Sequence, residues 1–300
     1  MALTTIADLT NESPEMILYY TSLARRLKGD YDEFIRNDDD DASFEVQFRS
    51  SIHRAEGAHA SEISLDGCPR QVVYSMIGVE KQQKIDPFWK KRFRVGHAIH
   101  AMLQNDFERM SEKTGGLLSY EAEVPISPQW QEVAKRLGIH SHCDGVFSFR
   151  EKPAGPVVLR VATEIKTDSP KEFENRKEPS KFHLDQATIY MACLDIPLLW
   201  FVYYNKGNQN MVPSSEPFLI RFDHRRWQKL EAIIKERWED AEALRLPDRK
   251  EGIKCCFCSY AHFCKPAYLV QKEKTEKYKQ QRRQETYKNP NRKQRGLKLT

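Results

Sequence analysis

The chain has 300 residues, of which 40% are apolar and 30% are charged, and it carries seven cysteines and a formal net charge of +5. This apolar content is enough to bury a sizeable core, so we expect one large catalytic domain with appendages. No apolar run reaches the roughly 18 residues that span a bilayer, and the N-terminus lacks the charged-then-apolar order of a signal peptide. We therefore expect a cytoplasmic protein with no membrane partner, in which clustered cysteines indicate a metal rather than disulfides.

The positive charge is concentrated at the C-terminus. Residues 269–300 hold eleven Lys or Arg against three Glu, a net charge of +8, which leaves −3 for residues 1–268. This segment has few large apolar residues, so we expect it to begin as a helix and to end disordered. Such a tail can add sequence-independent phosphate contacts. Charge runs are also often solvated tails without a dedicated partner, and both interpretations stay open.

In chain order, the sequence predicts a helix over residues 14–36, an exposed acidic loop over residues 37–41, a helix capped by Ser61 that runs through Cys68 and Tyr74, and a long amphipathic helix over about residues 88–113. Strands follow over residues 117–126, 142–150 and 157–167, the last two joined by a turn at residues 153–156. A helix over about residues 181–193, strands over residues 198–204 and 217–222, and a helix over residues 224–246 complete the order. This order predicts an α/β fold with a mixed sheet.

The candidate chemistry begins with Asp144 and with the pair Glu164 and Lys166. Residues i and i+2 of a strand face the same side, so Glu164 and Lys166 project together, and a hairpin through residues 153–156 lays Asp144 beside them. Carboxylates bind hard divalent cations, while a lysine ammonium holds an attacking water or supports charge that develops on phosphorus. Glu and Lys alternate on many solvated strands. Here the apolar residues 157–159 and 161–162 indicate a central strand, where a charged face needs a partner or a metal.

Two helical features extend this candidate site. His100 follows Gly96 on the long helix, where a neutral imidazole can complete a metal site. Gln186 and Tyr190 are spaced i, i+4 on the next predicted helix and therefore share a face. On the residues alone, a lone helical histidine is more often structural, and the second pair also fits an ordinary half-buried helix.

Four of the seven cysteines lie in one short stretch near the C-terminus. Cys255, Cys258 and Cys264 can surround one inorganic centre, and Cys68, far upstream, is the fourth thiolate that we expect. Four thiolates also form a tetrahedral zinc site, and ligand chemistry alone does not decide between zinc and an iron–sulfur cluster. Cys256 could replace Cys255 as a ligand.

The motifs Gly96-x3-His100, Asp144-Gly145, Glu164-x-Lys166 and Gln186-x3-Tyr190 resemble, in this order, the successive motifs of RecB-like nucleases in the PD-(D/E)XK superfamily. The resemblance implies a divalent metal ion, Mn²⁺ or Mg²⁺, held by His100, Asp144, Glu164 and the carbonyl of Ile165. It also implies that Lys166 lies beside the attacking water, and that Gln186 and Tyr190 support the DNA and the lysine. The first acidic signature of the superfamily often reads Pro-Asp, whereas Cys143 precedes Asp144 here; the carboxylate does the coordination, so the departure is tolerable.

The split cysteine set resembles that of CRISPR-associated RecB-like exonucleases and of the AddB nuclease domain, and it implies a [4Fe–4S] cluster held by Cys68, Cys255, Cys258 and Cys264. The implied fold is a PD-(D/E)XK core, a mixed central sheet flanked by helices, with the cluster joining the N- and C-terminal segments. Residues 1–53 would form an N-terminal helical extension, residues 54–268 the nuclease domain, and residues 269–300 the basic tail. Cys143 and Cys193 fall outside the set, and we expect them in the core.

The resemblance covers about residues 54–266 and implies a metal-dependent DNA exonuclease that acts on single-stranded DNA or DNA ends in recombination, repair or spacer processing. The residues alone support only metal-assisted phosphodiester cleavage. The alternative is a DNA-binding or recruitment subunit of a larger nucleic-acid-processing complex, with little cleavage of its own. The chain has no Walker-type phosphate-binding segment, so any unwinding would need a recombination, helicase or spacer-acquisition partner.

Overall fold

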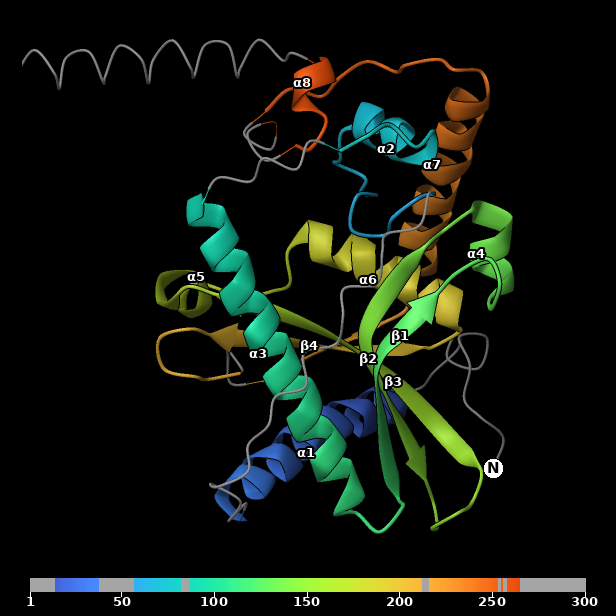
Figure 1. The fold of residues 1–300 in the computed structure, drawn as a ribbon. Helices are drawn as coiled ribbons and strands as arrows, with labels where there is room; N and C mark the ends of the chain where they lie inside the picture. The colour runs from blue at the N-terminus through green and yellow to red at the C-terminus, as the bar shows by residue number, and fades with distance from the viewer. Residues whose placement is uncertain are drawn as a thin grey trace, which may run out of the picture.

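The computed structural model describes residues 14–37, 57–81, 87–211, 216–252, 255 and 258–264. Its elements are α1 (Pro14–Asn37), α2 (Pro69–Met76), α3 (Pro87–Glu112), β1 (Leu118–Ile126), α4 (Glu132–Leu137), β2 (Ser141–Arg150), β3 (Val157–Asp168), α5 (Pro170–Glu174), α6 (Lys181–Leu194), β4 (Leu198–Asn205), β5 (Phe218–Arg221), α7 (His224–Glu242) and α8 (Ala261–Cys264), as Figure 1 shows. The predicted acidic loop, the basic tail and Cys256 lie outside the described residues.

The five strands form one mixed sheet in the order β1-β2-β3-β4-β5. Strands β1, β2 and β3 are an antiparallel meander, β4 is parallel to β3, and β5 is antiparallel to β4. A parallel pair needs a crossover connection, which α5 and α6 provide between β3 and β4. Every residue of β4 is buried, as expected for a central strand covered on both faces. The predicted mixed sheet flanked by helices is confirmed.

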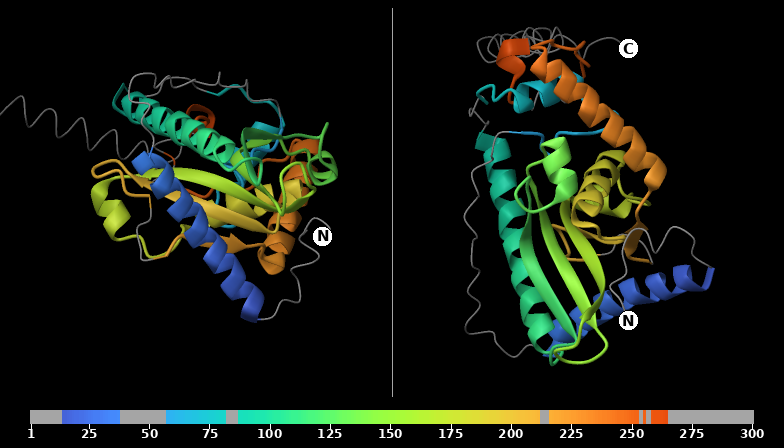
Figure 2. Two further views of the ribbon diagram at one scale, coloured as in Figure 1. Left: turned by 90° about the horizontal axis from the view of Figure 1, so that it is seen from below. Right: turned by 90° about the vertical axis from the view of Figure 1, so that its right-hand side faces the viewer.

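Each face of the sheet carries its own hydrophobic cluster. Side chains of β3 alternate between them: Val161 and Ile165 join Leu103 of α3 on one face, and Ala162 joins Ile189 of α6 on the other. Figure 2 shows α3 on one side of the sheet and α6 with α7 on the other. Glu164 and Lys166 lie on the same face of β3 as Ala162, so their side chains point toward α6.

Helix α1 covers the α3 face of the sheet. Its apolar positions Leu23, Leu27, Tyr31 and Phe34 are buried in the same cluster as the second half of α3. The Tyr31 hydroxyl donates to the buried Asp106 carboxylate at 2.9 Å. The helix of the predicted N-terminal extension is therefore part of this core, while the boundary at residue 53 stays a prediction.

Two predicted helix boundaries are wrong. The helix predicted from Ser61 begins only at Pro69, with Cys68 as its N-cap residue, because the residue before a proline is disfavoured in the helical conformation. The helix over residues 224–246 ends at Glu242, and Leu244 follows in a left-handed conformation at φ 49°. The short helices α4, α5 and α8 were not expected, since each is too brief to show a helical period.

The segment around Cys68 meets the end of the described chain beside α7. The rings of Tyr74 and Tyr260 lie 5.4 Å apart, and the Arg70 guanidinium donates to the carbonyl of Pro247 at 2.9 Å. The loop before Cys68 is tied to α6 by the buried Asp185, which accepts hydrogen bonds from the Ser64 hydroxyl and from Arg226. The expected meeting of the two cysteine segments is therefore present, close to the helix that carries Gln186.

None of the helices in the described part of the chain is long and apolar enough to cross a membrane.

Candidate active site

The candidate site lies where β2 and β3 part. Their pairing runs to Gly145 opposite Thr163, and Asp144 is the next residue along β2. The Asp144 carboxylate turns to the neighbouring strand, where Oδ2 accepts a hydrogen bond of 2.6 Å from the backbone amide of Ile165. Gly145 is required by its surroundings, because a Cβ there would lie 2.0 Å from the Tyr120 hydroxyl. The hairpin thus brings Asp144 beside the Glu164-x-Lys166 strand, as the sequence predicts.

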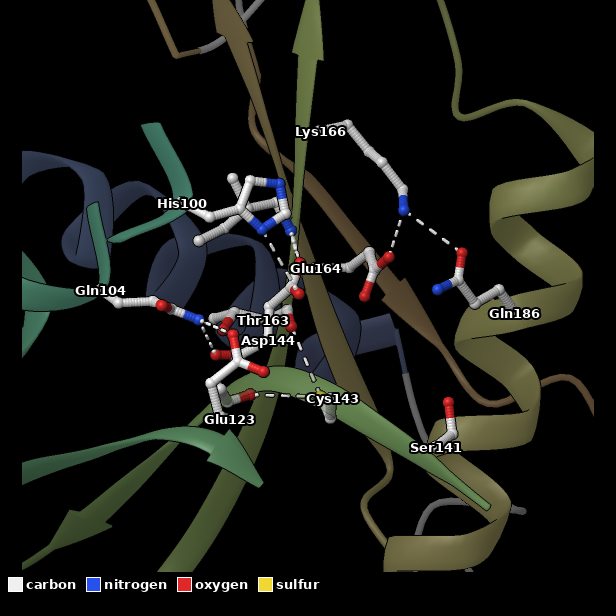
Figure 3. Close-up of polar contacts among 12 residues, drawn as sticks. His100, Gln104, Glu123, Ser141, Cys143, Asp144, Thr163, Glu164, Lys166 and Gln186 are labelled. Carbon is white, nitrogen blue, oxygen red and sulfur yellow. Dashed lines mark hydrogen bonds and ion pairs between the residues drawn. The ribbon is translucent and has the colours of Figure 1, made fainter. Parts of the chain in front are cut away.

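Glu164, Lys166 and Gln186 form a connected polar row between β3 and α6 (Figure 3). Only 1% of Glu164 is exposed. Its Oε1 accepts an ion-paired hydrogen bond from Lys166, whose ammonium also donates to Gln186 Oε1 at 3.2 Å. The second oxygen, Glu164 Oε2, is buried and has no hydrogen-bond partner. A buried carboxylate oxygen without a partner is costly, so this atom points to a missing cation or proton.

The charges of the site are strongly coupled. Burial, reinforced by the negative charge of Asp144, raises the pKa of the Glu164 carboxyl to about 7. Burial opposes ionisation of Asp144 too, but His100 and Lys166 lower the pKa of that carboxyl below its ordinary value. Burial would lower the pKa of Lys166, yet the two carboxylates raise it, so the lysine is charged. When both carboxylates are ionised and His100 is neutral, the site carries one more negative charge than Lys166 neutralises.

His100 enters from the opposite face of the sheet. It lies on α3, and its Nδ1 is 3.5 Å from Asp144 Oδ1. Burial would lower the pKa of this imidazole, but the Asp144 carboxylate outweighs that effect and raises it. Figure 3 shows that His100 and Glu164 lie on two sides of Asp144. Three of the four predicted metal ligands therefore gather here, together with the backbone of the fourth, Ile165.

Tyr190 lies behind Gln186 on α6. Its hydroxyl accepts a hydrogen bond of 2.7 Å from Gln186 Nε2 and is 3.4 Å from the Ser141 hydroxyl. Tyr190 is only 3% exposed, and its link to Lys166 runs through the Gln186 amide. The i, i+4 spacing that the sequence shows is what allows this contact.

Two further polar residues lie behind Asp144, and the sequence interpretation did not include them: Gln104 contacts Asp144, and Glu123 contacts Gln104. Gln104 lies one helical turn after His100, and its Nε2 donates to the Asp144 carbonyl at 2.8 Å and to the Glu123 carboxylate at 2.7 Å. Glu123 has φ 52° within β1, a left-handed conformation rare for any residue other than glycine. Gln104 could have been found from its i+4 spacing to His100, whereas no sequence signal marks Glu123.

The four predicted cluster cysteines line one pocket. Cys68, Cys255, Cys258 and Cys264 surround it together with Arg70 and Tyr74. Burial and the neighbouring thiols raise the pKa of Cys258. Cys143 and Cys193 are buried in the core, which confirms the prediction for these two.

Within the described residues, no three His, Cys, Asp or Glu side chains are already placed to hold a metal ion. At the candidate site this agrees with the contacts above, because Asp144 and Glu164 direct one oxygen each to Ile165 and Lys166. Binding of a cation there requires these side chains to turn.

No protein-family model matches the chain, and no curated protein matches it at a significant level. Among solved structures, SSO0001 is 18% identical over 83% of this chain and 96% of that chain, with a TM-score of 0.35. The alkaline exonuclease LHK-Exo from Laribacter hongkongensis is 15% identical over 64% of this chain and 90% of that chain, with a TM-score of 0.41. LHK-Exo in complex with dAMP is also 15% identical, over 63% of this chain and 89% of that chain, with a TM-score of 0.34. These similarities are too remote to define the function of this chain.

Proposed function

We propose that the chain is a divalent-metal-dependent DNA nuclease. The observation that carries the proposal is Glu164 Oε2, an unpartnered carboxylate oxygen buried beside Asp144. Structural ion pairs normally satisfy both oxygens of a buried carboxylate, whereas a metal site leaves one ready for the cation. The nearby lysine, imidazole and second carboxylate are the groups that phosphodiester hydrolysis needs.

The residues present fit a single hard divalent cation, Mn²⁺ or Mg²⁺. Glu164, Asp144, His100 and the carbonyl of Ile165 would hold it, a donor set of oxygens with one imidazole. Such an ion supplies Lewis-acid activation of water and stabilises negative charge on phosphate oxygens. The cation would offset the negative charge that the two carboxylates carry when both are ionised.

The remaining residues of the row orient the reacting groups. The Lys166 ammonium is held between Glu164 and Gln186, so its position is fixed before substrate arrives. From there it can hydrogen-bond the attacking water and offset charge on the phosphate. Tyr190 keeps the Gln186 amide in the orientation that accepts from Lys166. We therefore assign Asp144, Glu164 and Lys166 catalytic roles and Gln186 and Tyr190 positioning roles.

We also propose that Cys68, Cys255, Cys258 and Cys264 hold a [4Fe–4S] cluster. The donor atoms fit in kind, because four cysteines from two distant segments line one pocket and all four are free thiols, which would have to draw together around the group. The resemblance to the split cysteine set of CRISPR-associated RecB-like exonucleases supports the cluster over zinc. Bound there, the group would tie α2 to the C-terminal segment and make folding depend on it.

Within the nuclease class, we propose exonuclease action on single-stranded DNA or DNA ends, with a recombination, helicase or spacer-acquisition partner where unwinding is needed. The test is to incubate anaerobically purified protein with linear and circular single-stranded DNA, using Mn²⁺, Mg²⁺ or EDTA. Loss of the linear DNA alone, only with metal, is expected. Cleavage of circles would make the enzyme an endonuclease, and tight binding without any cleavage would favour the recruitment subunit.

A further inference from the structure

The first half of α3 leaves an aromatic side chain uncovered next to the candidate site. Residues 91–95 are all exposed, while Leu103 and Phe107 in the second half of the same helix are fully buried. Phe93 is 49% exposed. A helix that packs on a sheet normally places its aromatic residues in the core, and Phe93 lies outside it.

Phe93 belongs to the face of α3 that carries the site residues. With 3.6 residues per turn, Phe93 and His100 are seven residues apart and differ by only about 20° around the helix. Gln104 falls on the same line, one turn further. Gly96 also lies on this face, and a Cβ at Gly96 would be 3.7 Å from the Thr167 hydroxyl, next to Lys166. The site-facing stripe of α3 therefore continues outward from His100 and ends in Phe93, about 10 Å along the axis.

The sequence around Phe93 is basic. Arg92 and Arg94 flank the stripe, one on each side, and the sequence holds no Asp or Glu between Asp86 and Asp106. Both arginines lie on the exposed first half of the helix. An exposed ring with guanidinium groups on both sides matches the arrangement that binds single-stranded nucleic acids.

We propose that Phe93 stacks on an unpaired base of the DNA substrate, two to three nucleotides from the bond that is cut. This inference rests on the proposed nuclease function and deepens it by naming the strand state of the substrate. The distance of about 10 Å corresponds to three nucleotides at a stacked rise of roughly 3.4 Å, and to fewer in an extended strand. An intact duplex offers no free base face at this point. Phe93 therefore favours single strands and frayed ends over paired DNA, with little preference for sequence.

The test measures binding without cleavage. In a Glu164→Gln background and in EDTA, the affinity for a labelled oligothymidine and for a blunt hairpin duplex is determined by fluorescence anisotropy. Phe93→Ala and Phe93→Leu are each expected to weaken single-strand binding about 10-fold, because both lose the ring. Phe93→Tyr, which keeps a ring, should stay within about 2-fold of the parent. Duplex affinity should be the same in all four proteins.

The chain supplies a matched control. Val95 lies on the same helix and has the same exposed fraction of 49%. Because it is two residues after Phe93, it faces away from the stripe. Val95→Ala should leave both affinities unchanged. Equal single-strand affinities for Phe93→Leu and Val95→Ala would overturn the proposal. So would a Phe93→Leu protein that loses the same affinity for single strands and for duplex. The proposal would also fail if the parent protein did not bind single strands. If the parent did not bind single strands but wild type bound other proteins through Phe93, the ring would be a protein-docking residue.

The two proposals fail in different ways. Ring-dependent single-strand binding by a wild-type protein that cleaves nothing would refute the nuclease and leave Phe93 as a DNA contact. Cleavage by wild type, combined with normal binding by Phe93→Leu, would refute the stacking contact and leave the nuclease.

Discussion

The Asp144 carboxylate accepts a 2.6 Å hydrogen bond from the backbone amide of Ile165, so the two strands that carry the acidic residues are joined at the site itself. One oxygen of Asp144 is thereby fixed, and the other faces His100 at 3.5 Å. The same carboxylate both holds the geometry and supplies charge. Substitutions can separate these two roles.

Asp144→Asn keeps an oxygen that accepts from the Ile165 amide but removes the charge. We expect metal-dependent cleavage to fall about 100-fold or more, because stabilisation by the cation is lost. The free energy of unfolding should fall slightly, since the attraction of the ionised carboxylate to His100 and Lys166 outweighs its burial. Asp144→Ala should be equally inactive and about 1 kcal/mol less stable than Asp144→Asn, because the amide loses its acceptor. Urea unfolding and cleavage assays check this, and an active Asp144→Asn protein would contradict the assigned role.

Gln104 donates hydrogen bonds to the Asp144 carbonyl and to the carboxylate of Glu123, so we propose that it is a positioning residue. Gln104→Ala should raise the Mn²⁺ concentration for half-maximal activity about 10- to 100-fold, the usual effect of losing a group that orients a metal ligand. Activity at saturating Mn²⁺ should recover most of the wild-type value. Gln129→Ala, at an exposed loop position, is the control. A lower kcat at saturating Mn²⁺ with unchanged metal dependence would make Gln104 merely structural.

The cysteine pocket predicts a coloured protein. Anaerobically purified wild type should contain iron and sulfide and absorb broadly in the visible range, whereas Cys258→Ala should be colourless and poorly soluble, because the cluster joins two segments of the chain. Cys193→Ala removes a buried thiol outside the pocket and should keep the colour. A colourless wild type with one zinc ion per chain would replace the iron–sulfur cluster by a zinc site.

The basic tail over residues 269–300 lies outside the described residues, and its role stays a prediction. Deleting it should weaken DNA binding and flatten the dependence of the logarithm of affinity on the logarithm of salt concentration, because phosphate contacts are lost. Binding to one oligonucleotide at several salt concentrations measures both quantities. If neither changed, the tail would be a solvated segment without a role in binding.

Much of the fold was predictable because its signals are local. The alternation in Glu164-x-Lys166, the turn at residues 153–156 and the i, i+4 pair Gln186 and Tyr190 each fix a face or a neighbour over a few residues. The mixed sheet follows from the order of these elements.

Other features depend on contacts between distant segments. The left-handed Glu123 and the Tyr120 hydroxyl that fills the space beside Gly145 arise from the packing of β1 on β2, which no periodicity encodes. Likewise, Asp185 looks like a polar helix residue in the sequence, although it is buried and bonds Ser64 and Arg226. Pro69 is a local signal for the start of α2, because the residue before a proline is disfavoured in a helix.

The most direct test of the central claim is Mn²⁺ binding and single-strand cleavage by wild type and by Glu164→Gln, which keeps the shape of the side chain but removes its charge. Calorimetric titration should show Mn²⁺ binding to wild type that is weakened at least about 100-fold in the variant, with cleavage lost in parallel and DNA binding and thermal stability retained. A Glu164→Gln protein that binds Mn²⁺ and cleaves DNA like wild type would show that the buried Glu164 carboxylate is not the metal ligand, and the proposed active site would be wrong.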